Sequence, residues 1–243
     1  MERGPLIRLS VIVPTYNERE SLPALLTRLE AVAQTLPLEV VIVDDASPDG
    51  TGPLGEELAR AMSMRVAVLH RPARSGLASA AIDGAAVAHG RVLSVMDADL
   101  SHPPELLPAL AAAVDAGADI AVASRYIPGG GIEDWSRPRR LLSFAATSLA
   151  RTVLRLPVRD PLSGYFAVRT ALLMGHAYFG LGYKLLLELL VRHPAGTVVE
   201  IPYRFVDRRR GSSKLTIGEV GAFVVLLFGL RRYQRSARAA VLR

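Results

Sequence analysis

Val92-Leu-Ser-Val-Met-Asp97-Ala-Asp99-Leu-Ser101-His-Pro-Pro104 is an apolar run that ends in two carboxylates one residue apart. Side chains at positions i and i+2 of a strand share a face, so we expect Asp97 and Asp99 to converge at the end of this strand. Such pairs bind hard cations such as Mg²⁺ or Mn²⁺ through oxygen. A lone pair of this kind is as often a solvated turn. A second acidic strand end, Val40-Val-Ile-Val-Asp44-Asp45, favours a nucleotide and metal site instead.

Outward from this run, predicted strands and helices alternate. Strands are predicted at residues 9–13, 39–43, 65–69, 91–96 and 119–123. Helices are predicted at residues 21–33, 53–62, 77–88 and from about 103. This alternation predicts an α/β fold with a mostly parallel sheet flanked by helices. After Arg125 come a Gly-rich loop at 126–135, helices at 141–156 and 183–192, and strands at 165–169 and 197–201.

Composition and charge narrow the function. The 243 residues are 50% hydrophobic and 21% charged, which is typical of a globular chain. They include no cysteine, which excludes disulfides and thiolate sites. Ten Arg and Lys residues stand against Asp207 and Glu219 from Arg204 onward, a local charge of +8 in a chain of net +6. A basic tail on a near-neutral body indicates a polyanionic partner, either phosphates, nucleic acid or an anionic membrane surface.

The apolar run Phe223–Phe228 is too short to span a bilayer, and Arg231-Arg232 close it. Two interpretations stay open: a helix lying at a membrane interface, or an ordinary buried C-terminal helix with a solvated basic end. Nucleic-acid binding is disfavoured because no aromatic residues are interleaved in the triplet Arg208-Arg209-Arg210. The N-terminus lacks a basic region followed by an apolar run, so we expect no cleaved signal and a cytoplasmic location.

Several motifs together resemble a known family. Val11-Ile-Val-Pro14-Thr-Tyr16-Asn17-Glu18 and Val43-Asp44-Asp45-Ala-Ser-Pro-Asp-Gly-Thr51 are similar to the opening of family 2 glycosyltransferases, metal-dependent inverting enzymes of the GT-A (Rossmann-like) fold. Met96–Pro104, Ser124-Arg-Tyr126, Asp160-Pro-Leu-Ser-Gly164 and Gly211-Ser-Ser-Lys214 resemble its dolichol-phosphate (polyprenol-phosphate) mannose synthase branch. The resemblance covers residues 9 to 215 in matching order.

The resemblance implies transfer of mannose from GDP-mannose to dolichyl or polyprenyl phosphate, giving a β-linked product. It implies a donor site made of Pro14, Tyr16, Glu18, Asp45, Asp97, Arg208 and Lys214. Asp97 and Asp99 would hold Mg²⁺ or Mn²⁺, with Asp99 counted as catalytic. The family commonly has Gln at the position of Ser101. Because serine is shorter, Ser101 would be only a weak third ligand. His102 either touches this site or caps the helix that begins at Pro103.

The resemblance also implies an acceptor-phosphate site made of Arg125, Arg139 and Ser143, with both arginines counted as catalytic. A lipid phosphate is already anionic, so positioning by arginine replaces a strong general base. For Arg140 a solvated or lipid-facing charge is favoured over catalysis.

We expect residues 1–215 to form the catalytic domain and residues 216–243 to associate with a membrane. With the apolar helix at 141–156, this segment would place the enzyme peripherally on the cytoplasmic face, directly or through a membrane-anchoring partner protein. Alternatives are a polyprenyl-phosphate glucosyltransferase with a UDP-sugar donor, a transferase with a soluble acceptor, and a catalytically silent scaffold on this fold.

Overall fold

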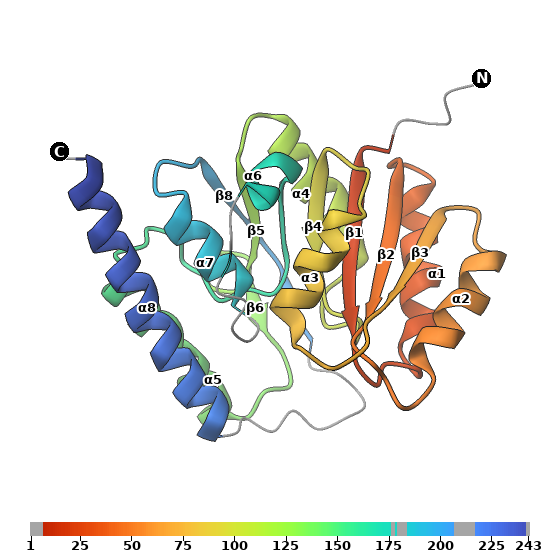
Figure 1. Cartoon of the computed structure of the whole chain (residues 1–243), viewed down its shortest axis with the longest axis horizontal. Helices are drawn as coiled ribbons and strands as arrows, with labels where there is room; N and C mark the ends of the chain where they lie inside the picture. The colour runs from red at the N-terminus through yellow and green to blue at the C-terminus, as the bar shows by residue number, and fades with distance from the viewer. Residues whose placement is uncertain (1–6, 176–177, 179–183, 207–216, 242–243) are drawn as a thin grey trace.

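The computed structural model describes residues 7–175, 178, 184–206 and 217–241. A seven-stranded sheet in the order β3-β2-β1-β4-β7-β5-β8 forms its centre (Figure 1). The strands are β1 (Leu9–Thr15), β2 (Leu38–Asp44), β3 (Arg65–His70), β4 (Val92–Val95), β5 (Ile120–Ser124), β6 (Gly131–Ile132), β7 (Phe166–Arg169), β8 (Val198–Pro202) and β9 (Arg204–Phe205). The helices are α1 (Leu22–Ala33), α2 (Thr51–Ala61), α3 (Leu77–Ala86), α4 (Leu107–Asp115), α5 (Arg137–Leu154), α6 (Thr170–Met174), α7 (Leu185–Arg192) and α8 (Ile217–Val241), with a 3-10 turn η1 at Pro104–Leu106.

The sheet is parallel except at one strand. β1, β2, β3 and β4 pair in parallel, as do β5 and β8, whereas β7 runs antiparallel between β4 and β5. β6 and β9 form a separate short parallel pair. This arrangement confirms the predicted mostly parallel α/β sheet. All seven residues of β1 and of β2 are buried, as expected for strands covered on both faces.

Helices cover the two faces of the sheet in separate layers. Leu25 and Leu29 of α1 and Leu110 of α4 pack on one face with Val11 and Val40. On the other face α3, α6 and α7 pack against β1, β2, β4, β5 and β7. The connections therefore change face between β1 and β4, and ligands of such sheets bind beyond the carboxyl ends of the strands at this point. The loops that carry the acidic residues of β2 and β4 lie at this edge.

Several predicted boundaries shift. The helix predicted at 141–156 begins four residues earlier, because Pro138 suits a first helical turn and the chain enters it from an extended Ser136. It ends at Leu154, followed by Arg155 in the left-handed region at φ 54°. β1 extends through Thr15, two residues beyond the predicted end at residue 13, so Pro14 lies inside the strand.

The C-terminal helix α8 packs alongside α5 and α7 (Figure 1). Leu226, Leu227 and Leu230 form its buried side, in one cluster with Ala150 and Leu154 of α5. Its other side exposes Val224, Val225 and Phe228. The interpretation as a buried helix therefore holds for one side of α8, and membrane contact stays a prediction for the other. No described helix is long and apolar enough to cross a membrane.

Candidate active site

The acidic pair follows β4 and is held by its own turn. Asp99 Oδ1 accepts hydrogen bonds from the Ser101 amide at 3.1 Å and from the Ser101 hydroxyl at 2.5 Å. β4 ends at Val95, and Leu100 has a φ of 64° in the left-handed region. Asp97 and Asp99 therefore lie in a turn, and the expectation that strand alternation brings them together is wrong. Ser101 is buried, and its hydroxyl proton is directed at Asp99.

His102 supports Asp97 from inside the protein. Its Nδ1 accepts the backbone N–H of Asp97 at 2.9 Å, and its Nε2 lies 3.7 Å from Asp97 Oδ2. The ring stacks on Tyr165 with centroids 5.0 Å apart. Burial lowers the pKa of His102, although the charges of Asp97 and Asp99 partly oppose this. His102 therefore touches the acidic site, and its interpretation as a helix cap is wrong: Pro103 occupies the cap position of η1.

The donor set at this turn fits a hard cation. Asp97 is one-third exposed, and residue 164 beside its carboxylate is glycine, which leaves room next to the oxygens. Among the described residues no cluster of three or more His, Cys, Asp and Glu side chains is placed to hold a metal ion. Two carboxylates with remaining positions filled by substrate phosphates and water are the ligand set that Mg²⁺ commonly takes.

Arg125 follows β5 and forms a buried ion pair that the sequence did not predict. Its Nε and Nη2 donate to the two carboxylate oxygens of Asp160 at 2.8 Å each, and its backbone N–H donates to Asp160 Oδ2 at 3.0 Å. Asp160 is fully buried. Burial alone would lower the pKa of Arg125, but the hydrogen bonds and charge of Asp160 outweigh it and raise this pKa. The guanidinium is thus permanently charged and fixed in orientation.

A cavity of about 430 Å³ lies beside Arg125. Its lining combines two arginines with apolar side chains: Arg125, Tyr126, Gly130, Gly131, Ile132, Arg140, Leu141 and Phe144. The Ser143 hydroxyl lies 2.9 Å from the hydroxyl of Tyr126, one of the lining residues. A lining that combines arginines with apolar side chains suits an anion that carries a hydrocarbon tail.

The arginines at the start of α5 are directed to different places. The guanidinium of Arg139 lies over the ring of Trp135, with its central carbon 4.1 Å from the ring centroid. Arg140 is exposed, as expected for a charge that faces solvent or lipid, and it also lines the cavity with Arg125. The structure therefore brings Arg125 and Arg140 to one cavity, connects Ser143 to it through Tyr126, and places Arg139 against Trp135.

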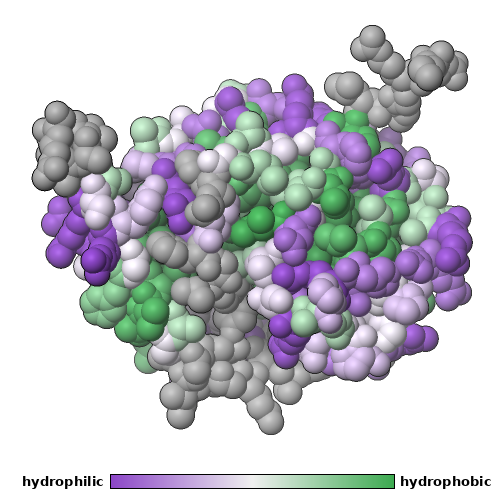
Figure 2. Space-filling view, viewed as in Figure 1, coloured by the Kyte–Doolittle hydropathy of each residue, from purple (hydrophilic) through white to green (hydrophobic). Residues whose placement is uncertain are grey.

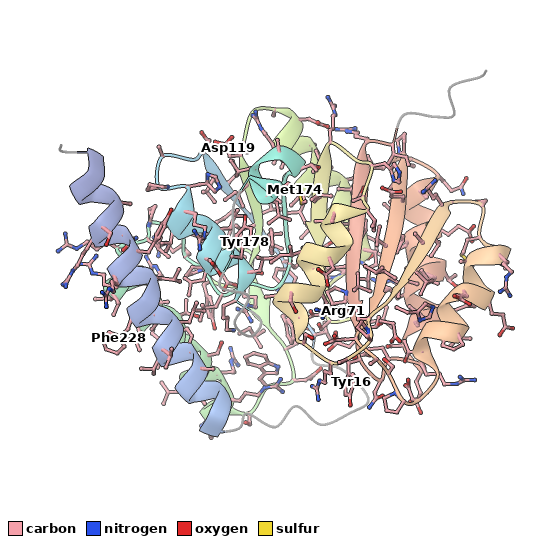
Figure 3. All side chains as sticks on the ribbon, in the orientation of Figure 1. Tyr16, Arg71, Asp119, Met174, Tyr178 and Phe228 are labelled. Atoms are coloured by element: carbon pink, nitrogen blue, oxygen red, sulfur yellow. The ribbon has the colours of Figure 1, made fainter. Side chains whose placement is uncertain are left out.

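The predicted donor residues lie at the carboxyl ends of β1 and β2. Tyr16 has the guanidinium of Arg74 over its ring at 3.9 Å. Asp45 accepts hydrogen bonds from Arg71 Nη1 at 2.6 Å and from the amides of Ser75 and Gly76 at 3.0 and 2.9 Å. Figure 3 shows Tyr16 and Arg71 at the same edge of the sheet, whereas Asp119 lies at the opposite edge. In this structure the carboxylate of Asp45 anchors the loop that follows β3.

Glu18 is tied to the start of α2 and to Ser21. Its amide donates to Thr51 Oγ1 at 3.0 Å, and its carboxylate accepts from the Ser21 hydroxyl at 2.7 Å. Pro14 is buried within β1, one residue before the strand ends. Arg208 and Lys214, the remaining donor predictions, lie outside the described residues.

Sequence reasoning missed three residues that contact the predicted ones: Arg71, Arg74 and Asp160. The signal for the arginines was available, because Arg71-Pro-Ala-Arg74 directly follows an apolar strand and so lies at the ligand-binding edge. Asp160 stood in a motif that was noted, but no local pattern pairs it with a residue 35 positions away.

Comparison with known proteins agrees with this geometry. The sequence profile described as Glycosyl transferase family 2 matches residues 10–175. The chain is 40% identical over 230 residues to a dolichol-phosphate mannosyltransferase of Pyrococcus furiosus, covering 94% of this chain and 65% of that protein. It is also 40% identical over 247 residues to the polyprenol monophosphomannose synthase of Mycolicibacterium smegmatis, covering 98% of this chain and 92% of that one.

Solved structures show the same fold. Glucosyl-3-phosphoglycerate synthase from Mycobacterium tuberculosis, in complex with Mn²⁺, uridine diphosphate and phosphoglyceric acid, superposes with a TM-score of 0.69 at 20% identity. That match covers 93% of this chain and 78% of the other. Sheet order, acidic turn and sequence match lead to one assignment: this chain belongs to glycosyl transferase family 2.

Proposed function

We propose that this chain transfers mannose from GDP-mannose to a dolichyl or polyprenyl phosphate, with inversion, to give a β-linked lipid-phosphate mannose. The observation that carries this proposal is the cavity beside Arg125, where two arginines face Leu141, Phe144 and other apolar walls. A phosphate on a hydrocarbon chain matches both parts of that lining. The names of the two relatives support the same acceptor class.

In the proposed reaction a phosphate oxygen of the lipid attacks the anomeric carbon of mannose, and the bond to the GDP oxygen breaks. The attacking oxygen is already anionic, so the protein needs to orient it and strip water from it and does not need a strong base. Arg125, held by Asp160, would bind this phosphate with help from the start of α5. Ser143 would act through its contact with Tyr126.

On the donor side, Asp97 and Asp99 would hold a Mg²⁺ or Mn²⁺ ion, which when bound supplies positive charge to the departing diphosphate. Tyr16 and Glu18, with Pro14 behind them, would contact the nucleoside together with the Asp45 loop. Arg208 and Lys214 would bind the diphosphate from the other side. Ser101 would orient Asp99 by hydrogen bonding and would bind the ion only weakly.

We further propose that the protein sits peripherally on the cytoplasmic face of a membrane through α5 and α8. The apolar face consists of Leu141, Leu142, Phe144 and Leu149 of α5 with Val224, Val225 and Phe228 of α8. Figure 2 shows the apolar side chains of α8 beside the hydrophilic end of the same helix. Because α8 packs on α5 and α7, it is not a structurally separate domain. Under this proposal residues 216–243 differ from the catalytic part in function only. A membrane-anchoring partner protein would act on the same face.

The test is a transfer assay with purified protein, a short polyprenyl phosphate and Mg²⁺, with labelled GDP-mannose compared to labelled UDP-glucose. We expect label in the organic phase from GDP-mannose alone. Label from UDP-glucose alone would replace the sugar donor. No transfer from either donor would contradict the lipid acceptor and favour a soluble one.

A further inference from the structure

The segment Asp160-Pro-Leu-Ser-Gly164, called the 160–164 segment below, contacts both halves of the candidate site. Its first residue pairs with Arg125 and its last lies beside Asp97. Only four positions separate these two residues, so the segment spans the space between the cavity and the acidic turn. The proposed function assigns roles to Arg125 and Asp97, which the two ends contact, but none to the segment that joins them.

At the Arg125 end the contact leaves little freedom. Asp160 accepts three hydrogen bonds from Arg125, two from the guanidinium and one from the amide. Glu200 of β8 accepts in turn from the amides of Arg159 and Asp160, at 2.8 and 3.1 Å. Nε and Nη2 donate to Asp160, and Nη1 does not. Asp160 thus fixes the direction in which the N–H groups of Nη1 point.

In its middle the segment is fixed to the sheet. The Ser163 hydroxyl donates to the carbonyl of Ala123 at 2.7 Å, and the amide of Tyr165 donates to Ser163 Oγ at 3.2 Å. Ala123 is in β5, two residues before Arg125, and Tyr165 is the residue on which His102 stacks. One serine thus connects the strand that carries Arg125 to the wall behind His102.

At the Asp97 end the backbone comes close to the acidic turn. A methyl group on Gly164 would lie 3.3 Å from His102 Cε1 and 3.7 and 3.8 Å from the two carboxylate oxygens of Asp97. His102 is buried, stacks on Tyr165 and accepts the Asp97 amide, so a shift of its ring would disturb both contacts. Any larger residue at 164 would press on the side chains that orient Asp97.

We infer that the 160–164 segment is a positioning element that fixes the distance and direction between the acceptor-binding Arg125 and the donor-side carboxylate Asp97. This rests on the proposed function for the identity of the two ligands. In-line attack requires acceptor and donor phosphates to be held in one alignment, and a shared rigid segment provides it. Its two ends are separable: damage at Asp160 affects the acceptor, and damage at Gly164 affects the donor side.

The test uses Asp160→Asn and Gly164→Ala with two readouts besides turnover. Calorimetry without donor gives the Kd of a short polyprenyl phosphate, and a separate titration gives the Kd of GDP with Mn²⁺. We expect Asp160→Asn to weaken binding of the lipid phosphate about tenfold or more, because Arg125 loses a charged partner, with GDP affinity within about twofold. Gly164→Ala should weaken GDP–Mn²⁺ binding about tenfold, with a smaller effect on the lipid phosphate.

Two control variants separate positioning from loss of stability. Glu188→Gln breaks another buried pair, Glu188–Arg192 of α7, so it should lower stability but leave both affinities unchanged. Gly229→Ala adds a methyl group where no atom outside the helix lies within 4 Å. The inference is overturned if Asp160→Asn matches Glu188→Gln in both affinities, or if Gly164→Ala matches Gly229→Ala.

The same experiment distinguishes failure of the proposed function from failure of the positioning role. If the wild-type protein binds the lipid phosphate but transfers no mannose, the assigned reaction is wrong. The positioning role would still be supported by the weaker binding of Asp160→Asn. If the wild-type protein does not bind the lipid phosphate at all, both are wrong.

Discussion

At the scale of single residues, Asp99 is the side chain whose removal tests the metal assignment most directly. Its Oδ1 accepts hydrogen bonds from both the amide and the hydroxyl of Ser101. We expect Asp99→Ala to reduce mannosyl transfer by at least about 100-fold, because the departing diphosphate loses several kcal/mol of charge stabilisation. Circular dichroism and the thermal midpoint should stay near wild type. Turnover like that of the wild type in the folded variant would overturn the assignment.

Arg139 and Arg140 are neighbours that the structure sends to different partners. Arg140 lines the cavity with Arg125, and Arg139 stacks on Trp135. We therefore expect Arg140→Gln to raise the KM for a short polyprenyl phosphate about tenfold, the loss of one charged hydrogen bond. The matched variants Arg139→Gln and Arg137→Gln should raise it less. If Arg139→Gln raised the KM most, Arg139 would be the arginine that binds the phosphate, as the family resemblance implies.

At the scale of elements, Glu39 ties the start of β2 to its surroundings. Burial raises the pKa of this carboxyl, but hydrogen bonds from the Ser10 hydroxyl and the His89 amide outweigh burial and hold the pKa below the ordinary 4.5. The unfolded chain therefore takes up this proton first as the pH falls. Glu39 contributes stability that is complete above about pH 5 and is lost as the pH falls through its folded pKa.

The measurement for Glu39 is urea unfolding at a series of pH values. We expect Glu39→Gln to lower the free energy of unfolding by about 2 kcal/mol at pH 7, because a buried charged acceptor is lost. The variant should also show a shallower fall in stability between about pH 5 and pH 3 than the wild type. Glu57→Gln, an exposed change on α2, is the matched control. Parallel pH curves for wild type and Glu39→Gln would contradict this account.

The elements also show how far the sequence alone could reach. The strands were predictable because fully buried parallel strands are continuous apolar runs, as at Val40–Val43, bounded by turn residues. The antiparallel placement of β7 between β4 and β5 was not, because periodicity gives no direction or neighbour. Likewise the pairing of Arg125 with Asp160 depends on that placement, since β7 brings the 160–164 segment back beside β5.

At the scale of the whole molecule, the apolar face and the Arg125 cavity share two residues. Leu141 and Phe144 are exposed on α5 and also line the cavity, so the face continues into the candidate acceptor site. Arg231, Arg232 and Arg235 follow Phe228 on α8 and suit anionic head groups. A membrane docked on this face would present a lipid phosphate directly to Arg125. The position of α8 beside α5 would then serve to bring the acceptor to the site.

This geometry predicts binding to anionic liposomes that depends on both the apolar face and salt. We expect the wild-type protein to float with the liposomes at low ionic strength and to be partly released by about 0.5 M salt, which screens the arginines. The double change Val225→Ser and Phe228→Ser should reduce flotation strongly, because both side chains point out of the fold, Phe228 being 72% exposed (Figure 3). Val87→Ser, an exposed apolar residue after α3, should have no effect.

The same double variant also separates membrane docking from catalysis. It leaves the cavity and the acidic turn intact, so transfer to a short polyprenyl phosphate in detergent should match the wild type. Transfer to a long-chain polyprenyl phosphate embedded in liposomes should fall in proportion to the lost flotation, because docking then limits access to the acceptor. A wild-type protein that stays wholly unbound at low salt would contradict peripheral attachment through α5 and α8 and would leave a separate anchoring protein as the route to the lipid.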